Sequence, residues 1–359
     1  MTDEAELIRV ASQFPFADDL RRWERLGAGH IHDTFRLSFA SGDYLLQRIN
    51  QSVFADVVPL MRNSEIVCDA LAAAKSRGEY PLQIAAPLKT SLGELIAQEG
   101  GGLWRASTYL AGSYALDRVE TAVQADAAGH AFGSFAAALC SVEELGLELL
   151  LPNFHHLGHR LAQLETALSA DLAGRASEVG AEANYCLQAV PFAAALESLE
   201  SDLPRRVTHN DTKVSNLLFS SDDDQPLAVV DLDTCMPGYL MHDFGDLVRS
   251  SVSSLAEDAS PEAGVTVRES IFAALARGYL KPLRGVATVE EQESLWLGGP
   301  TLCLLVGTRF LTDYLNGDSY FSTSYPTHNL VRARNQLALH TALVRQENRL
   351  RPLLLEQVE

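Results

Sequence analysis

One short polar segment carries the side chains best suited to chemistry. It reads HNDTKVSN over residues 209–216 and lies between two runs of β-type residues. The segment offers a carboxylate (Asp211), a cation (Lys213) and an amide oxygen (Asn216), and 15 residues later Asp231 ends an apolar run. Hard oxygen ligands of this kind suit Mg²⁺, which bridges nucleotide phosphates, and a lysine can reach a γ-phosphate as a point charge. The pattern predicts phosphoryl transfer.

The elements before this segment predict a β-rich lobe over residues 1–110. Apolar residues at helical spacing indicate a leading helix in the first ~20 residues. Three β-type runs follow in residues 22–50, broken by two turn sequences, and a helix is expected over 57–75. Two more strands are expected at 92–98 and 103–109, which gives this lobe five strands and one main helix.

The rest of the chain, residues 111–359, predicts a helical lobe. Alanine-rich helical patterns occupy 119–145, 155–172 and 184–199, and the chain from 243 onward is again mostly helical. The polar segment sits in the middle of this lobe, on a β-hairpin whose acidic turn is 222–226. The pattern predicts an α+β fold of two lobes.

The composition excludes several classes of protein. The chain of 359 residues has 28 Lys and Arg against 47 Asp and Glu, a net charge of −19, which disfavours binding to nucleic acid or to anionic membranes. No segment approaches the ~20 apolar residues of a membrane span, and the acidic start MTDEAELIRV does not resemble a secretory signal. Five scattered cysteines without a CxxC pair indicate reduced thiols, so we expect a cytoplasmic protein.

The polar segment resembles a known catalytic loop. It follows the protein-kinase pattern H-R-D-x-K-x-x-N and, more closely, the H-x-D-x-x-x-x-N loop of the aminoglycoside phosphotransferase and choline kinase superfamily. Within that superfamily the N-acetylhexosamine 1-kinases are similar in the segments VTHNDTKVSNLLF, VVDLDTCMPG, HDFGD and RFLTDYLNGDSYF, and in YPTHNLVRARNQLAL. The resemblance runs from about residue 22 to about residue 345.

The resemblance implies a protein-kinase-like fold that binds ATP and Mg²⁺ between its lobes. It implies Asp211 as the base or orienter of the accepting hydroxyl, assisted by Lys213, and Asn216 and Asp231 as the Mg²⁺ ligands. The expected reaction is phosphorylation of a small hydroxylated molecule, first of all at the anomeric hydroxyl of an N-acetylhexosamine, which is an amino sugar. Alternatives are another acceptor (an aminoglycoside, choline, homoserine or a different sugar) and an ATP-binding pseudokinase that transfers no phosphate.

Three further residues follow from the resemblance on the acceptor side: Thr234, Arg309 and Tyr320. Sugar recognition needs directional hydroxyl partners beside an aromatic or guanidinium surface, and these residue types fit. Each also has an ordinary structural interpretation. Arg309 is equally typical of a helix-surface ion pair, and Tyr320 of a partly buried core aromatic.

The residues expected to bind the nucleotide form a less specific sequence pattern than the segment 209–216. Gly27 and Gly29 stand between two strands, where backbone could cover phosphates, although this spacing alone is more typical of a hairpin turn. Arg48 stands where relatives carry the cation that binds the α- and β-phosphates, and a guanidinium suits that contact. Its acidic helix partner would be Glu65, unless that helix position is occupied by Arg62.

The adenine would lie against the segment that leaves the N-terminal lobe. The resemblance implies backbone hydrogen bonds there, with Thr108 and Leu110 as the binding residues.

Two other acidic residues close to Asp231 in the sequence are expected to play supporting roles. Asp243 begins a literal DFG triplet, but it falls 32 residues after Asp211, whereas Asp231 falls 20 after it and ends a strand. We predict that Asp243 caps a helix start and braces the loop. Asp233 shares the strand face of Asp231 and is a reserve ligand or a supporting group.

Three histidines occur together at positions 155, 156 and 159. We interpret them as the solvent-exposed start of a helix.

Overall fold

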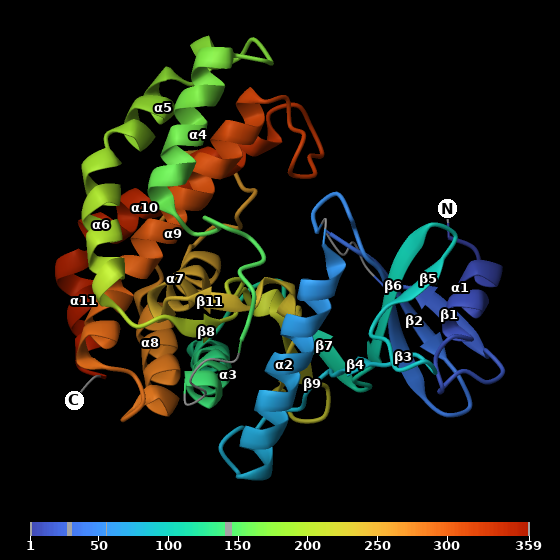
Figure 1. Cartoon of the computed structure of the whole chain (residues 1–359). Coiled ribbons are helices and arrows are strands. Elements are labelled where there is room, and N and C mark those ends of the chain that lie inside the picture. The colour runs from blue at the N-terminus through green and yellow to red at the C-terminus, as the bar shows by residue number, and fades with distance from the viewer. Residues whose placement is uncertain (1, 27–30, 55, 141–145, 358–359) are drawn as a thin grey trace.

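The computed structural model describes residues 2–357 apart from 27–30, 55 and 141–145. The N-terminal third forms a β-sheet region and the remainder a larger helical region beside it (Figure 1). The predicted α+β class is confirmed. Gly27 and Gly29 lie outside the described residues.

A twisted antiparallel sheet forms the N-terminal region. Its strand order is β1-β2-β3-β6-β4, and β5 pairs with the other part of β6. One face is covered by helix α1 (Glu4–Ala11), because alternate residues such as Phe35, Leu46 and Trp104 are buried on that face with Leu7. The strands are β1 (Arg22–Arg25), β2 (Asp33–Ser38), β3 (Asp43–Arg48), β4 (Pro87–Leu88), β5 (Ala97–Glu99) and β6 (Gly102–Thr108).

The strand predicted at 92–98 is wrong over most of its length. Residues 90–94 form a tight turn in which the backbone N–H of Thr90 donates to the oxygen of Glu94, and Gly93 adopts a φ of +85°. Leu92, which looked like a strand residue, is 89% exposed at the tip of the turn. Only β5 remains of this strand, and the very short β4 takes the other place beside β6.

Helix α2 (Val57–Ser76) lies between the sheet and the helical region (Figure 1). Asp56 caps its first turn by accepting from the N–H of Val58. Its bounds agree with the predicted helix at 57–75.

The helical region contains nine α-helices among the described residues and two small sheets. The predicted helix at 184–199 divides into two, because the chain turns at Gln188 and Ala189 and Pro191 stands at the start of the second helix. The helices are α3 (Ala122–Cys140), α4 (Leu157–Ala170), α5 (Gly180–Leu187), α6 (Val190–Asp202), α7 (Leu240–Ser251), α8 (Glu269–Leu283), α9 (Val289–Leu315), α10 (His328–Arg345) and α11 (Glu347–Leu355). The small sheets are β10-β9-β7 and β11-β8, from β7 (Ser113–Ala115), β8 (Arg206–Thr208), β9 (Leu217–Ser220), β10 (Pro226–Val229) and β11 (Met236–Gly238).

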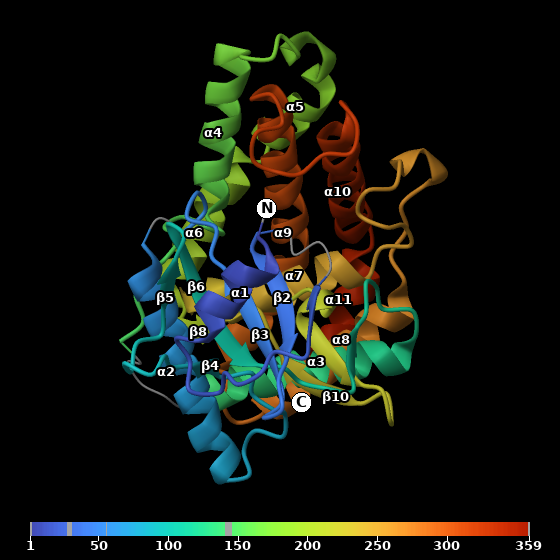
Figure 2. The same ribbon diagram turned by 90° about the vertical axis from the view of Figure 1, so that its right-hand side faces the viewer.

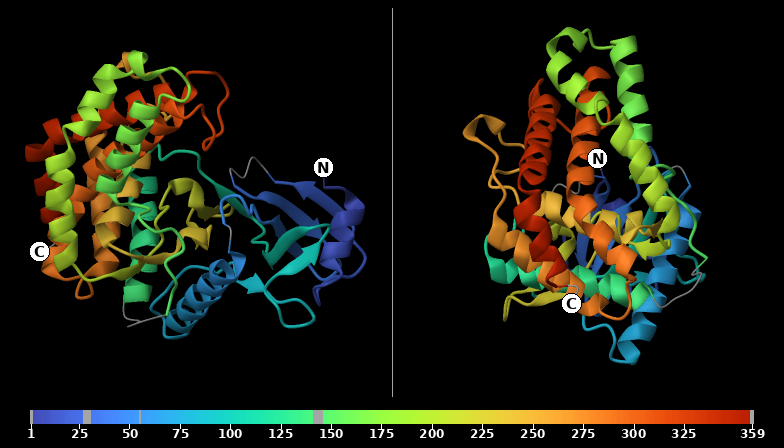
Figure 3. Two further views of the ribbon diagram at one scale, coloured as in Figure 1. Left: turned by 45° about the horizontal axis from the view of Figure 1, so that its top comes forward. Right: turned by 90° about the vertical axis from the view of Figure 1, so that its left-hand side faces the viewer.

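Helices α4, α5, α9 and α10 extend past the N-terminal sheet on one side of the molecule (Figures 2 and 3). Helix α9 is the one described helix that is long and apolar enough to cross a bilayer, but 78% of its most apolar stretch is buried inside the protein. It is the central core helix of this region, packed between α7 and α10.

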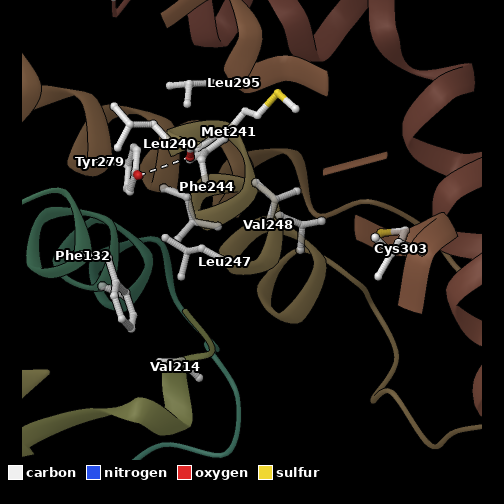
Figure 4. Packing of buried hydrophobic residues seen from close by; sticks show 14 of the residues in the cluster. Phe132, Val214, Leu240, Met241, Phe244, Leu247, Val248, Tyr279, Leu295 and Cys303 are labelled. Atoms are coloured by element: carbon white, nitrogen blue, oxygen red, sulfur yellow. Dashed lines mark hydrogen bonds between the residues drawn. The ribbon is translucent and has the colours of Figure 1, made fainter. Parts of the chain in front are cut away.

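Helix α7 is buried on nearly every side. Phe244, Leu247 and Val248 pack in a cluster with Phe132 of α3 and Tyr279 of α8 (Figure 4). A helix that is buried all round cannot shift without disturbing several neighbours. It therefore fixes the polar groups of its first turn.

The crossing of α7 with α9 depends on two glycines. A Cβ on Gly298 of α9 would lie 1.9 Å from the backbone oxygen of Met241, and a Cβ on Gly245 of α7 would lie 2.4 Å from the backbone of Gly298. The contact is backbone to backbone, so no flexible side chain can give way. Any larger residue must separate the two helices.

We expect Gly298→Ala to lower the free energy of unfolding by about 3 kcal/mol, because the new methyl group overpacks this crossing. Gly180→Ala is the matched control, since nothing lies within 4 Å of a Cβ there, and it should leave stability unchanged or slightly raised. Urea unfolding followed by circular dichroism measures both. Equal stability of the two variants would contradict this account of the crossing.

Candidate active site

The segment 209–216 forms a loop that a buried carboxylate holds in shape. Asp243, in the first turn of α7, accepts hydrogen bonds from the backbone N–H groups of His209 at 2.9 Å and Asn210 at 2.7 Å. Its backbone oxygen also accepts from the Thr212 hydroxyl at 2.5 Å. Asn210 has a φ of +63°, a left-handed conformation that such bonds help to maintain.

The predicted bracing role of Asp243 therefore stands, but its predicted capping role is wrong. Tyr239 is the residue that precedes α7, and Asp243 lies inside the first turn with its carboxylate turned to the loop. Both carboxylate oxygens are used in this way, which leaves Asp231 as the candidate for the metal.

Asp211 projects from the loop with each carboxylate oxygen engaged. Oδ1 lies 2.9 Å from Lys213 Nζ, and Oδ2 accepts from Asn216 Nδ2 at 2.8 Å. Burial by itself would raise the pKa of Asp211, but Lys213, His209 and Asn216 outweigh it and lower that pKa to about 2. Asp211 is thus an ionised acceptor at neutral pH and a weak base.

Asn216 is oriented by the same contacts. It lies in the short 3-10 turn η2 (Val214–Asn216), and Nδ2 donates to both the backbone and the side chain of Asp211. Because the nitrogen faces Asp211, Oδ1 is the atom that can ligate a cation.

Asp231 lies after β10, beside the loop 209–216. His209 joins the two, since its Nε2 lies 3.0 Å from the oxygen of Val230 and its Nδ1 accepts from the N–H of Asp211. Burial, then the nearby Asp233 and Asp211, raise the pKa of Asp231 to about 7. The carboxylate is therefore destabilised as an anion by its surroundings, and a bound divalent cation would relieve this.

The residues present fit Mg²⁺ bound together with a nucleotide. Asp231 and Asn216 supply two hard oxygens, and Mg²⁺ commonly takes one or two protein ligands and completes its shell with water and phosphate. No three His, Cys, Asp or Glu side chains converge to form a self-contained metal site in the described part of the chain. A site completed by phosphate agrees with that finding.

Asp233 has a different role from that of a reserve ligand. It lies in the 3-10 turn η3 (Leu232–Thr234), and both of its oxygens pair with the guanidinium of Arg105, with Nη2 to Oδ2 at 2.8 Å. His32 Nε2 lies 2.7 Å from the same Oδ2, and the N–H of Asn50 donates to His32 Nδ1. Arg105 and His32 belong to the N-terminal sheet region, so Asp233 ties that sheet to the catalytic segment.

Arg48 does not face this site, which corrects its prediction as the phosphate-binding cation. It lies on the α1 side of the sheet, with its guanidinium 5.9 Å from the ring centre of Trp104. Strand residues alternate between faces, so the neighbouring Gln47 and its β6 partner Arg105 occupy the opposite face, where Arg105 Nε donates to Gln47 Oε1 at 2.9 Å.

The helix partners proposed for Arg48 are also engaged elsewhere. Glu65 Oε1 lies 2.8 Å from Lys89 Nζ, and Arg62 lies 3.9 Å from Glu148.

Arg105 is the cation that sequence reasoning missed. The alternation of β6 could have indicated this, because the apolar Trp104 and Ala106 face α1 and so place Arg105 on the opposite face of the sheet. The pairing of Arg105 with Asp233, 128 residues away, has no counterpart in local sequence.

Thr108 and Leu110 occupy the predicted connection. Thr108 ends β6 opposite Tyr44, and the oxygen of Leu110 accepts from the Ser113 hydroxyl at 2.6 Å. The chain then enters β7, which pairs with β9 of the helical region. Contact of these residues with adenine remains a prediction.

The three acceptor-side residues fall into two places. The Thr234 hydroxyl donates to the oxygen of His209 at 2.6 Å, so Thr234 adjoins the catalytic loop. Arg309 and Tyr320 lie together in a hollow of about 800 Å³ between α4 and α9, with Arg309 Nη2 donating to the Tyr320 hydroxyl at 3.3 Å. Burial lowers the pKa of Arg309, and Asp211 is among the groups whose charge acts on it.

The Arg309 guanidinium is surrounded by aromatic rings. It lies 5.4 Å from the ring centres of Phe154 and Tyr320 and 5.3 Å from that of Phe321. Asp313 holds this wall in place by accepting from the N–H groups of Tyr320 and Phe321. This arrangement combines hydrogen-bond donors with apolar ring faces, the two features that a sugar-binding surface needs.

The histidine run is only partly a solvated helix start. His156 precedes α4 and accepts from the N–H of His159, as such a start would. His155 is instead turned inward, with Nε2 3.0 Å from the oxygen of Asn210.

A β-sheet region joined to a helical region, with a loop that holds Asp211, Lys213 and Asn216 beside Asp231, defines a kinase-like phosphotransferase. The comparisons agree: the model of the phosphotransferase enzyme family matches residues 22–285, and the chain belongs to this family. Its members transfer phosphate to small molecules.

Solved structures share the fold over nearly the whole chain. A choline/ethanolamine kinase family protein from Mesorhizobium loti is 17% identical (TM-score 0.59; 99% of this chain and 98% of that chain covered). An aminoglycoside phosphotransferase from Alicyclobacillus acidocaldarius is 15% identical (TM-score 0.55; 100% and 96% covered). A spectinomycin phosphotransferase in complex with ADP and spectinomycin is 12% identical (TM-score 0.50; 96% and 99% covered).

We expect Arg105→Ala to lower the free energy of unfolding by about 3–5 kcal/mol, because it leaves the buried Asp233 without its main counter-charge. Lys89→Ala breaks the exposed pair with Glu65 and should leave the free energy of unfolding nearly unchanged. Denaturant unfolding of both variants makes the comparison. Similar small losses would mean that Arg105 does not tie the sheet to the catalytic segment.

The free energy of unfolding should depend on pH because of Asp243. Burial raises its pKa from 3.8 to about 6. The folded state therefore binds a proton more readily than the unfolded chain, and the stability that this proton contributes is lost as pH rises from about 4 to about 6. Relative to Asp243→Asn, the unfolding free energy of the natural chain should fall by roughly 1 kcal/mol between pH 5 and pH 7. Parallel pH profiles for the two proteins, measured in urea, would contradict this.

Proposed function

We propose that this chain is an ATP- and Mg²⁺-dependent kinase that phosphorylates the anomeric hydroxyl of an N-acetylhexosamine. The observation that carries the proposal is the placement of Asp211, ionised and held by Lys213 and Asn216, near a hollow walled by Arg309 and Tyr320. A cytoplasmic location fits this use of ATP.

The loop geometry suits phosphoryl transfer by positioning. The acceptor hydroxyl would donate its hydrogen bond to Asp211 while its oxygen attacks the γ-phosphorus, and the bond from that phosphorus to the β–γ bridging oxygen breaks to leave ADP. The proton passes to Asp211 or to solvent. A pKa of about 2 makes Asp211 a weak base, which agrees with late proton loss and with an acidic anomeric hydroxyl.

The metal would be held by Asp231 and Asn216 Oδ1, and it would supply charge neutralisation at the β- and γ-phosphates. Lys213 would add a fixed positive charge beside Asp211. Thr108 and Leu110 remain the proposed backbone contacts of adenine, and Arg105 replaces Arg48 as the cation of the N-terminal sheet nearest this site.

The hollow between α4 and α9 favours a polyhydroxyl acceptor over choline. A quaternary ammonium needs open aromatic faces, but the rings of Phe154, Tyr320 and Phe321 already surround the Arg309 guanidinium. The same cation would repel the trimethylammonium group. A sugar hydroxyl can instead accept from the guanidinium and exchange hydrogen bonds with Tyr320.

The acceptor panel tests this proposal. ADP formation from Mg·ATP is measured with N-acetylglucosamine, N-acetylgalactosamine, plain hexoses, aminoglycosides, choline and homoserine, and the product is examined by phosphorus NMR. We expect turnover with the N-acetyl sugars and an anomeric phosphate as product. Turnover with a different acceptor alone would keep the catalytic loop and discard Thr234, Arg309 and Tyr320 as sugar contacts.

The matched variant for the panel is Asp211→Asn, which keeps the hydrogen bond geometry but removes the charge. It should reduce turnover by about 10²-fold or more while leaving ATP binding within a fewfold of the natural chain. Retained turnover would remove Asp211 from the mechanism. ATP binding without turnover on any acceptor in the natural chain would favour a pseudokinase.

A further inference from the structure

The hollow between α4 and α9 contains a second guanidinium besides that of Arg309. Arg160, near the start of α4, lines the same hollow of about 800 Å³. Neither arginine forms an ion pair with a carboxylate in the part of the chain that the structure describes. In a chain of net charge −19, two cations that share one hollow without an acidic partner are unusual.

Both guanidiniums are partly withdrawn from water. Burial, followed by the charge of Arg309, lowers the pKa of Arg160 to about 10. Arginine side chains are seldom buried unless they are paired, because the charge loses its hydration. Two like charges close together also repel each other. An anion bound between them would offset both effects.

The nearby carboxylates are already engaged. Asp211 is the acid whose charge acts on Arg309, but its two oxygens are held by Lys213 and Asn216. Asp313 is the one acidic residue among the described residues that line the hollow. Its oxygens accept from two backbone N–H groups of the α9–α10 connection and from Asn329. The protein therefore supplies these two arginines with no counter-ion of their own from either acid.

Hydrogen-bond donors remain available on both guanidiniums. Arg309 has five N–H donors, and within the described ranges it makes one hydrogen bond, of 3.3 Å, to the Tyr320 hydroxyl. Arg160 donates from Nη1 to Gln163 Oε1 at 2.9 Å and from Nη2 to the oxygen of Phe154 at 3.0 Å, which leaves one hydrogen on each Nη. Guanidiniums match carboxylate and phosphate oxygens in geometry as well as in charge. A neutral hydroxyl would accept these hydrogen bonds but would leave the charge unbalanced.

We propose that the acceptor is an N-acetylhexosamine with an anionic substituent, a carboxylate or a phosphate ester, and that Arg160 and Arg309 bind this substituent in the hollow between α4 and α9. The inference rests on the proposed function, because it assumes that the anomeric hydroxyl lies at Asp211. Arg309 is near enough to Asp211 for the two charges to interact, so a substituent elsewhere on the ring can reach it. The hollow is also large enough for a substituted sugar.

The first test measures binding to the full chain without ATP, so that it does not depend on turnover. Isothermal titration calorimetry compares N-acetylglucosamine with its 3-O-carboxymethyl ether and with its 6-phosphate. We expect at least one of the anionic sugars to bind about tenfold or more tightly than the neutral sugar. Preference for the ether identifies a carboxylate site, and preference for the 6-phosphate a phosphate site. No preference for either anionic sugar would overturn the proposal.

Variants locate the bound anion. Gln163→Glu places a carboxylate against Arg160, because Gln163 Oε1 already accepts from that guanidinium, and the exposed position of Gln163 makes the change easy to accommodate. This variant and Arg160→Gln should each reduce the preference for the anionic sugar to less than about threefold. Arg345→Gln is the matched control, since it removes an exposed cation that does not line the hollow, and it should leave the preference unchanged. A preference that survives both Gln163→Glu and Arg160→Gln would place the anion elsewhere and overturn the proposal.

Steady-state ADP formation with the same three sugars separates this inference from the proposed function. A lower KM for an anionic sugar, lost in Gln163→Glu, supports both. Turnover of N-acetylglucosamine with no preference for an anionic sugar would keep the kinase and overturn the anion site. Tight binding of an anionic sugar that depends on Arg160, without turnover of any sugar, would overturn the sugar 1-kinase and leave the anion site standing.

Discussion

The structure of the site depends on one buried carboxylate. Asp243 accepts from two successive backbone N–H groups of the catalytic loop, and it does so from a helix that is packed on all sides. A loop with a residue in the left-handed region keeps its shape only when its surroundings hold it there. The position of Asp211 is thus set by the packing of α7 rather than by the loop itself.

Helix α7 also sets the position of the loop 209–216 relative to the hollow that contains Arg309. Gly245 of α7 meets Gly298 of α9 at backbone contact, and Arg309 lies three turns further along α9. Because the crossing tolerates no side chain, the distance between the catalytic loop and the acceptor hollow is determined by two backbones in contact. A rigid connection of this kind suits a reaction in which positioning contributes most of the catalysis.

The proposed site contains several cations although the chain as a whole is strongly acidic, with a net charge of −19. Three cations come from three different elements: Lys213 pairs with Asp211, Arg105 pairs with Asp233, and Arg309 lines the hollow between α4 and α9. Asp233 holds Arg105 in place and joins the N-terminal sheet to the segment that carries Asp231. Burial and the nearby Asp233 and Asp211 raise the pKa of Asp231, and a cation bound beside this carboxylate would offset that effect.

From the sequence alone one could predict the α+β class, the polar loop at 209–216 as the candidate catalytic loop, and Asp231 after its strand as the candidate metal ligand. These depend on short-range patterns, since Asp211, Asn216 and Asp231 lie on one hairpin and the period of the apolar residues changes from 2 to 3.6 along the chain. Tertiary structure alone decided that Arg48 faces α1, that Arg105 pairs with Asp233, and that His155 turns inward to Asn210. Those outcomes join residues far apart in the chain, and local backbone preference carries no information about which buried charges will meet.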